Sequence, residues 1–323
     1  MRAVLAVLAA AVCFGTTGTA QALGPEADPL SLGAARILIG GGALALIALV
    51  LARRRPRDHD ALVPEMPVLD GAPTGSAPTT DARRARLVSA AIVVAGAIGV
   101  LAYQPAFFAG TERNGVAVGT VVALGSAPVL TGLLEWAFRG HRPSGHWALS
   151  TVVATAGIAT LGLASGDAEH AIDPLGLAAS LGAGLSYAVY ALASKGLLER
   201  NWSGSGAMGA IFGSAAVVSL PLLLATDASW LATPDGLVMG LWLGLVTTTL
   251  AYLLFAAGLR HLTAATVSTL TLAEPLTATL LGLFVLGERL PVGAAIGLAV
   301  LAAGLTILAL PVRRRAVRPP APR

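Results

Sequence analysis

The dipeptide Glu274-Pro275 joins two residue types that a membrane-spanning helix rarely accommodates, near the middle of the apolar run 264–286. An ionised carboxylate at this depth costs roughly 3 kcal/mol unless it is protonated, paired or hydrated. Pro275 has no amide hydrogen, so the carbonyl of Thr271 is expected to lack its helical donor. A carboxylate beside a free carbonyl can bind a cation or exchange a proton, and this chemistry is the first candidate function.

A weaker copy of the same stretch occurs earlier in the chain, because Pro128 lies 147 residues before Pro275. The same offset, without a gap, pairs Ala264 with Ala117, Leu281 with Leu134, Gly287 with Gly140, Arg289 with Arg142 and Gly304 with Gly157. The same offset pairs Glu274 with Ala127, so only the second copy carries the carboxylate. Two copies of one unit are typical of secondary transporters. We therefore predict that both prolines are hinges.

Composition identifies the class of protein. Of 323 residues, 55% are hydrophobic and 12% charged, against about 25% charged in soluble domains. An integral membrane protein in a lipid bilayer is therefore expected. The net charge of +4 does not indicate nucleic acid, because the basic residues abut apolar runs. The single cysteine, Cys13, excludes an intramolecular disulfide, the histidines share no ligand spacing, and we expect neither a metal nor a cofactor.

The apolar runs predict an all-α polytopic membrane protein with ten transmembrane helices arranged as two inverted five-helix repeats. The expected spans are residues 2–22, 30–52, 86–108, 115–137, 146–163, 174–194, 205–225, 236–258, 264–286 and 290–311. They give a first repeat over 1–163, a second over 174–311 and a basic tail over 312–323. Residues 53–85, rich in proline and charge without periodicity, predict a disordered loop.

The first span has an alternative interpretation as a signal peptide, because Arg2 precedes an apolar run that ends at Ala20-Gln21-Ala22. Its removal would leave nine spans and no partner for the sixth. Retaining it makes the two halves equal, so we expect residues 2–22 to remain in the protein as a span.

Lysine and arginine predict the orientation in the membrane. With the amino terminus in the cytoplasm, the inside segments hold 18 of these residues, and the outside segments hold only Arg113 and Arg289. Under the positive-inside rule, both termini of this multi-pass protein are cytoplasmic and the protein lies in the cytoplasmic membrane. Because five spans is an odd number, the second repeat is expected to be inserted upside down relative to the first.

Polar residues inside the predicted spans are few, and they are the candidate lining of a central cavity. Those expected to bind substrate or to couple transport are Glu274, Arg36, Gln104, Tyr103, Tyr187, Tyr190, Tyr252 and Thr271, with Ser126 and Thr248 as further candidates. Glu274 is the only carboxylate that we expect inside the membrane. It either takes part in transport or forms a structural salt bridge with Arg36, and the sequence leaves both possibilities open.

Enzymatic activity is not expected. The run Ser203-Gly204-Ser205-Gly206 could supply a nucleophile, but it falls in a loop at the start of a span. No histidine within a span is available to act as its base. This sequence therefore favours transport over catalysis.

Motifs in both copies resemble the EamA domain of the drug/metabolite transporter superfamily. In the second copy they are Ala273-Glu274-Pro275, Gly287-Glu288-Arg289-Leu290 and the span 297–304; in the first they are Leu124-Gly125-Ser126-Ala127-Pro128, Gly140-His141-Arg142-Pro143 and Ala34-Ala35-Arg36. The resemblance covers the chain apart from residues 53–85 and the tail. Two features depart from the family's pattern: His141 replaces the usual glutamate of the first copy, and the loop 53–85 is longer than usual.

The resemblance implies a ten-helix carrier of small metabolites such as amino acids, often coupled to protons. We therefore expect a secondary active transporter that works by alternating access. Export is the expected direction, but the sequence leaves import, the substrate, the coupling ion and the oligomeric state open. The alternative is a non-transporting membrane protein, either a sensor or a partner subunit, although the sequence offers no extramembrane domain for signalling. Stabilisation of the purified protein against heat by a substrate would favour the carrier.

The first testable prediction concerns orientation and follows from the uneven distribution of lysine and arginine. Single cysteines placed in the loop 53–85, in a Cys13→Ser background, should be shielded from an impermeant thiol reagent in intact cells. Single cysteines near Asp167 should react, because that loop is predicted to face outward. The opposite labelling pattern would exclude this orientation, and a mature chain that began after Ala22 would exclude the ten-span count.

Overall fold

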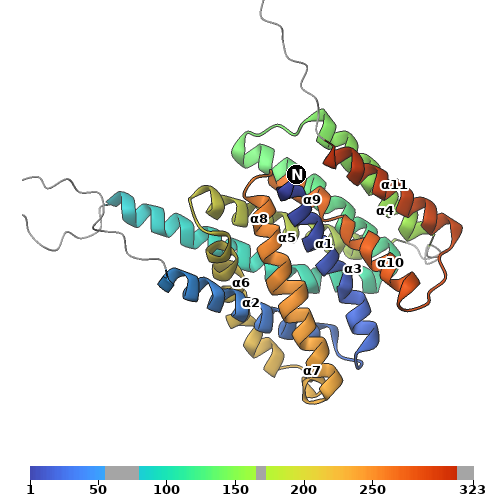
Figure 1. Cartoon of the computed structure of the whole chain (residues 1–323), viewed down its shortest axis with the longest axis horizontal. Helices are drawn as coiled ribbons and strands as arrows, with labels where there is room; N and C mark the ends of the chain where they lie inside the picture. Colours follow the sequence, from blue (N-terminus) through green and yellow to red (C-terminus); the bar gives the residue numbers. More distant parts are fainter. Residues whose placement is uncertain (55–79, 165–171, 311–323) are drawn as a thin grey trace, which may run out of the picture.

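The computed structural model describes residues 1–54, 80–164 and 172–310, and these ranges form helices without strands (Figure 1). The helices are α1 (Arg2–Leu23), α2 (Pro29–Arg54), α3 (Thr80–Arg139), α4 (Gly145–Leu163), α5 (Pro174–Glu199), α6 (Gly204–Leu224), η1 (Ser229–Ala232), α7 (Pro234–Leu241), η2 (Trp242–Leu250), α8 (Ala251–Leu259), α9 (Ala264–Leu270), α10 (Ala273–Phe284) and α11 (Val292–Ala309). Within the described ranges, nine helices are long and apolar enough to cross a membrane. The chain is therefore built as a polytopic membrane protein.

These helices lie where hydropathy predicted spans, but they are divided differently. The predicted span 236–258 consists of α7, η2 and α8, and the predicted span 264–286 consists of α9 and α10. The predicted spans 86–108 and 115–137 form the single helix α3, whose 60 residues greatly exceed one bilayer crossing. The predicted loop 53–85 is also shorter, because α2 continues to Arg54 and α3 begins at Thr80. Residues 55–79, like the predicted tail 312–323, lie outside the described residues.

The chain reverses direction within α3, at Gly115. Its backbone angles, φ 78° and ψ 156°, are not helical, and glycine adopts this positive φ without the steric penalty of a side chain. A Cβ on Gly119 would lie 2.7 Å from the Cα atom of Thr111. Residues eight apart in one continuous helix are separated by about 12 Å, so the two segments of α3 fold back on each other.

Contacts with α5 confirm this reversal. Along the first segment of α3 they are Gly99 to Tyr190 and Gly110 to Ser180, and along the second they are Ala123 to Gly184 and Arg139 to Leu192. The first segment therefore runs antiparallel to α5, and the second runs parallel to it. The count of ten spans and the inverted repeat remain predictions.

Polar contacts fasten the reversal to the start of α5. The buried Asn114 donates from Nδ2 to the carbonyl of Asp173 at 3.1 Å and accepts from its amide at 2.7 Å. Arg113 donates to the Asp173 carboxylate at 2.9 Å, and this hydrogen bond holds the pKa of that carboxyl below its ordinary value. Because both side chains of the ion pair are partly exposed, it contributes little stability. Asn114 therefore makes the more important contact.

Helices pair closely where glycine removes side chains from the interface. In Figure 1, α4 and α11 lie side by side at one edge of the bundle. A Cβ on Gly157 of α4 would lie 2.8 Å from the carbonyl oxygen of Gly297, and a Cβ on Gly297 would lie 2.5 Å from the amide nitrogen of Leu161. The two backbones are therefore in direct contact, as in other small-residue interfaces of membrane helices.

This contact predicts that Gly157→Ala destabilises the protein. The added methyl group would press against the backbone of α11, and overpacking of this kind costs about 1–3 kcal/mol. The melting temperature in detergent should fall, while Gly18→Ala, which meets no atom within 4 Å, should leave it unchanged or slightly raised. Equal melting temperatures for the two variants would contradict the close packing.

Candidate functional site

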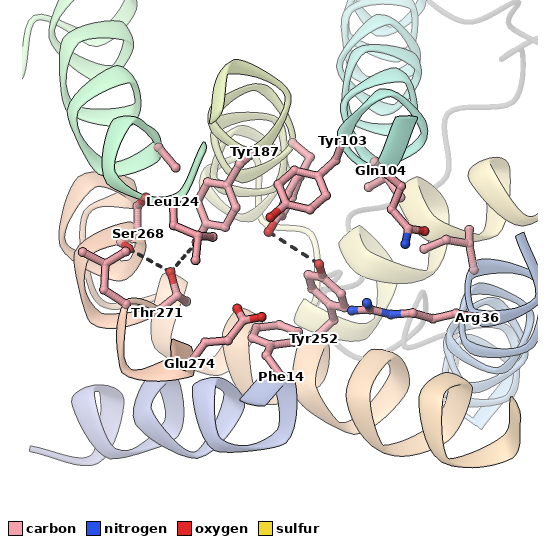
Figure 2. Close-up of a pocket in the computed structure, with 15 residues that line it drawn as sticks. Phe14, Arg36, Tyr103, Gln104, Leu124, Tyr187, Tyr252, Ser268, Thr271 and Glu274 are labelled. Atoms are coloured by element: carbon pink, nitrogen blue, oxygen red, sulfur yellow. Dashed lines mark hydrogen bonds between the residues drawn. The ribbon is translucent and has the colours of Figure 1, made fainter. Parts of the chain in front are cut away.

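A cavity of about 90 Å³ lies among α1, α2, α3, α5, α8 and the junction of α9 with α10 (Figure 2). All eight residues predicted to bind substrate or couple transport line it: Glu274, Arg36, Gln104, Tyr103, Tyr187, Tyr190, Tyr252 and Thr271. They include every tyrosine of the chain. Ser126 and Thr248 do not line the cavity; Ser126 lies against Gly184 of α5, and Thr248 binds Arg36.

Glu274 reaches the cavity because the helix is interrupted just before it. After α9 ends at Leu270, two residues form a turn, and α10 begins at Ala273. Glu274 and Pro275 therefore lie in the first turn of α10, where an acidic side chain is favoured and a missing amide hydrogen is tolerated. Among the described residues, the Glu274 carboxylate has neither a hydrogen-bond partner nor a salt-bridge partner, so it is available to a ligand.

The prediction that the Thr271 carbonyl is free is wrong. It accepts a hydrogen bond from the amide of Glu274 at 2.9 Å, because the turn places that amide where the helical donor would otherwise be. The Thr271 hydroxyl donates to the carbonyl of Ser268 at 2.8 Å and lies 2.8 Å from the Tyr187 hydroxyl. Since the Thr271 proton is already used, Tyr187 is the donor in the second contact.

The two predicted hinge prolines occupy different local structures. Pro275 lies at a break between two helices, whereas Pro128 lies inside α3, where only Gly115 departs from helical angles. Their equal spacing in the sequence therefore does not give them equal backbone conformations. Only Pro275 coincides with an interruption of its helix.

Arg36 enters the cavity from α2, on a different side from Glu274 (Figure 2). Its Nε atom donates to the Thr248 hydroxyl at 3.1 Å, and Nη2 lies 3.5 Å from the carbonyl oxygen of Thr247. Both threonines belong to η2, a π-helical segment, and such wide turns occur frequently at functional sites. The described residues contain no Arg36–Glu274 salt bridge, so the structural pairing considered from the sequence is not formed.

Aromatic rings make up much of the wall between the two charged groups. The centroids of Tyr187 and Tyr190 are 4.9 Å apart, and those of Phe14 and Tyr252 are 5.1 Å apart. The Tyr252 hydroxyl donates to that of Tyr190 at 3.5 Å. Ring faces attract cations within about 6 Å. The cavity can therefore hold a cationic group against Glu274 and the rings, and an anionic group against Arg36.

A second buried carboxylate, Glu135, was not among the residues predicted from the sequence to be functional. It lies in the second segment of α3, is 3% exposed, and accepts hydrogen bonds from the amides of Ala264 and Ala265 at 3.2 and 2.9 Å. Glu274 is therefore not the only carboxylate enclosed by the described helices, and its place as the only one inside the membrane stays a prediction. The available signal was the position of Glu135 inside the predicted span 115–137. Groups of metal-ligating side chains are absent from the described part of the chain.

Comparisons with known proteins identify the family of the chain. The model of the EamA-like transporter family matches residues 1–163 and 174–310. A Bacillus subtilis (strain 168) protein named Uncharacterized transporter YwfM is 39% identical over 312 residues, which are 96% of this chain and 95% of that protein. A solved crystal structure with 20% identity has a TM-score of 0.71 and covers 95% of this chain and 96% of its own; it shares the fold.

The break before Glu274 predicts the effect of Pro275→Ala. The new amide could donate to the Thr271 carbonyl, which would allow α9 and α10 to join and would slow exchange between inward-open and outward-open states. Paired spin labels across the cavity would measure the change. Pro128→Ala is the control, because its helix is already continuous, and identical distance distributions and transport in both variants would exclude a hinge at Pro275.

Proposed function

Because the chain belongs to the EamA-like transporter family and is a multi-pass membrane transporter, we propose that it is a secondary active carrier of a small metabolite. It works by alternating access in the cytoplasmic membrane, with both termini in the cytoplasm and export as the direction. One observation carries the proposal: an unpaired carboxylate and a guanidinium face one cavity from different helices.

The charges of the cavity favour a zwitterionic substrate, an amino acid or a related compound. The ammonium group would lie between the Glu274 carboxylate and the tyrosine rings, and the acidic group would bind the guanidinium of Arg36. The cavity volume of about 90 Å³ is well below the approximately 300–1,000 Å³ of most ligand pockets. The substrate is therefore small, or the cavity widens when the substrate binds.

The inverted repeat supplies the alternating access in this proposal. The offset of 147 residues relates the two halves, and the reversal at Gly115 supports counting α3 as two spans, five in each half. Such carriers bind substrate near the bilayer midplane, where the two repeats meet, often beside an interrupted helix. The break at the α9–α10 junction is consistent with that arrangement.

Glu274 also provides a route for coupling transport to protons. A charged carboxylate in a closed cavity is costly, so either a proton or the substrate's cationic group should accompany Glu274 whenever the cavity changes sides. The side chain would alternate between these two partners during the transport cycle. This coupling makes Glu274 the residue on which the function most depends.

Substitution of Glu274 tests the proposal. Glu274→Gln preserves the volume but cannot ionise, so it should fold, lose most net transport and lose its dependence on pH. Glu274→Asp should retain part of both. Arg36→Gln should weaken substrate binding by about 10–100-fold, because a hydrogen bond to a charged group contributes about 1.5–3 kcal/mol. Proteoliposomes with an imposed pH gradient and a labelled amino-acid mixture would measure transport.

Glu199→Gln is the control, since Glu199 carries the same charge at the end of α5, outside the cavity. It should transport like the wild type. A wild-type rate and pH profile in Glu274→Gln would remove this carboxylate from the mechanism and leave it a structural residue.

A further inference from the structure

A pair of charged side chains away from the cavity binds the loop between α8 and α9, here called the 260–263 loop. Lys195 of α5 donates from Nζ to the carbonyls of Leu259 and Leu262, both at 2.9 Å. The Glu135 carboxylate accepts from the first two amides of α9. The positive charge meets the end of α8 and the negative charge meets the start of α9, where each is stabilised by the helix dipole.

Further polar contacts extend from this loop to the cavity. The hydroxyls of Thr131 and Ser268 lie 3.4 Å apart, and those of Thr151 and Thr269 lie 2.9 Å apart. All four of these side chains are buried. The second segment of α3 and α4 are thus joined to α9 along its length, and the 260–263 end of the cavity is closed.

The packing between the second segment of α3 and the α9–α10 helices is open at the end opposite to the 260–263 loop. A cavity of about 500 Å³ separates the start of the second α3 segment from α10 and from the 288–291 loop. Its walls include Ala117 and Thr120 on one side and Ala278 and Thr279 on the other. Over the described residues, Thr120 and Thr279 make no hydrogen bond to each other across it; the Thr279 hydroxyl donates to the carbonyl of Pro275 in its own helix. The interface between these helices is therefore sealed at one end only.

The internal repeat places a counterpart of Glu135 at this open end. The offset of 147 residues pairs Glu135 with Gly282 and pairs Ala264 with Ala117. Gly282 has no side chain, but a Cβ on it would lie 3.1 Å from the Cδ atom of Glu288. The Glu288 carboxylate therefore occupies the space where a side chain of residue 282 would begin.

The local backbone holds Glu288 in this place. Its amide donates to the carbonyl of Gly282 at 3.0 Å, and the positive φ of Gly287, 69°, turns the chain back over α10. Glu288 lines the same 500 Å³ cavity as Ala117 and is exposed. Each half of the chain thus presents one carboxylate toward the beginning of a helix in the other half.

We propose that Glu135 and Glu288 are alternating gate residues of transport. Glu135 holds the 260–263 end closed, as in this structure. In the opposite conformation it releases α9, while Glu288 crosses the 500 Å³ cavity to accept hydrogen bonds from the amides of Ala117 and Val118. The inference rests on the proposed inverted repeat and alternating access. In the proposed orientation the 260–263 loop faces the cytoplasm, so this structure is closed on the cytoplasmic side.

The test measures both ends of the protein without substrate. In a Cys13→Ser background, one spin-label pair at His141→Cys and His261→Cys reports the 260–263 end, and another at Val116→Cys and Arg289→Cys reports the opposite end. Glu135→Gln should raise the population open at the 260–263 end, and Glu288→Gln should lower it. Each ratio should change about 10–100-fold, because each substitution removes hydrogen bonds to a charged group.

A matched control separates the gates from a general loss of charge. Glu112→Gln removes an exposed carboxylate near Arg113, outside the contacts of Glu135 and Lys195, and should not change the distances. Shifts in the same direction for Glu135→Gln and Glu288→Gln, or no shift in either, would overturn the proposal. If Glu135→Gln does not fold, Lys195→Met removes the hydrogen bonds of Lys195 at the same end instead. An unchanged distance between the labels at 141 and 261 in that variant would equally overturn the proposal.

The proposed gate residues and the proposed substrate site are tested by different measurements. The spin-label distances need no substrate, whereas the Glu274 variants are judged by transport. Opposite shifts in the two gate variants together with wild-type transport in Glu274→Gln would keep the gates and reject the substrate site. Loss of transport in Glu274→Gln, without opposite shifts in the two gate variants, would keep the substrate site and reject the gates.

Discussion

The interior of a membrane supplies no hydrogen-bond partners, so every backbone group that leaves a regular helix must be satisfied by the protein itself. This structure departs from the α-helix in three places of consequence. At Thr271 the carbonyl takes the amide of Glu274, and in η2 the carbonyl of Thr247 faces Arg36. At Gly115, Asn114 binds the backbone of Asp173. The first two departures border the cavity, and each positions one of its charged side chains.

The same constraint explains why the two charges remain apart. Arg36 is held on η2 by Thr248, and Glu274 projects from the first turn of α10, so the two charges enter the cavity from different helices. Burying an unpaired carboxylate is costly, and a ligand with a cationic group would relieve that cost. A cavity with separated opposite charges is suited to a ligand that carries both.

Glu135 and Lys195 show how charge is accommodated elsewhere in the bundle. Both are largely buried, yet neither is satisfied by an ion pair between them. Lys195 binds carbonyls at the end of α8 and in the 260–263 loop, and Glu135 binds amides at the start of α9. Helix ends supply those groups without a matching side chain. Contacts of this kind can be released by sliding one helix away from another, because the freed backbone groups at a membrane surface meet water.

The sequence alone determined the helical class, the position of most spans and most of the polar residues around the cavity. Those properties depend on local hydropathy and on the scarcity of polar residues, which must gather inside an apolar bundle. Only the tertiary structure decided that Arg36 binds η2, that the Thr271 carbonyl is occupied and that Glu135 is buried against α9. These features depend on which helix faces lie opposite one another and on where a helix is interrupted, and neither is encoded in the composition of a single segment.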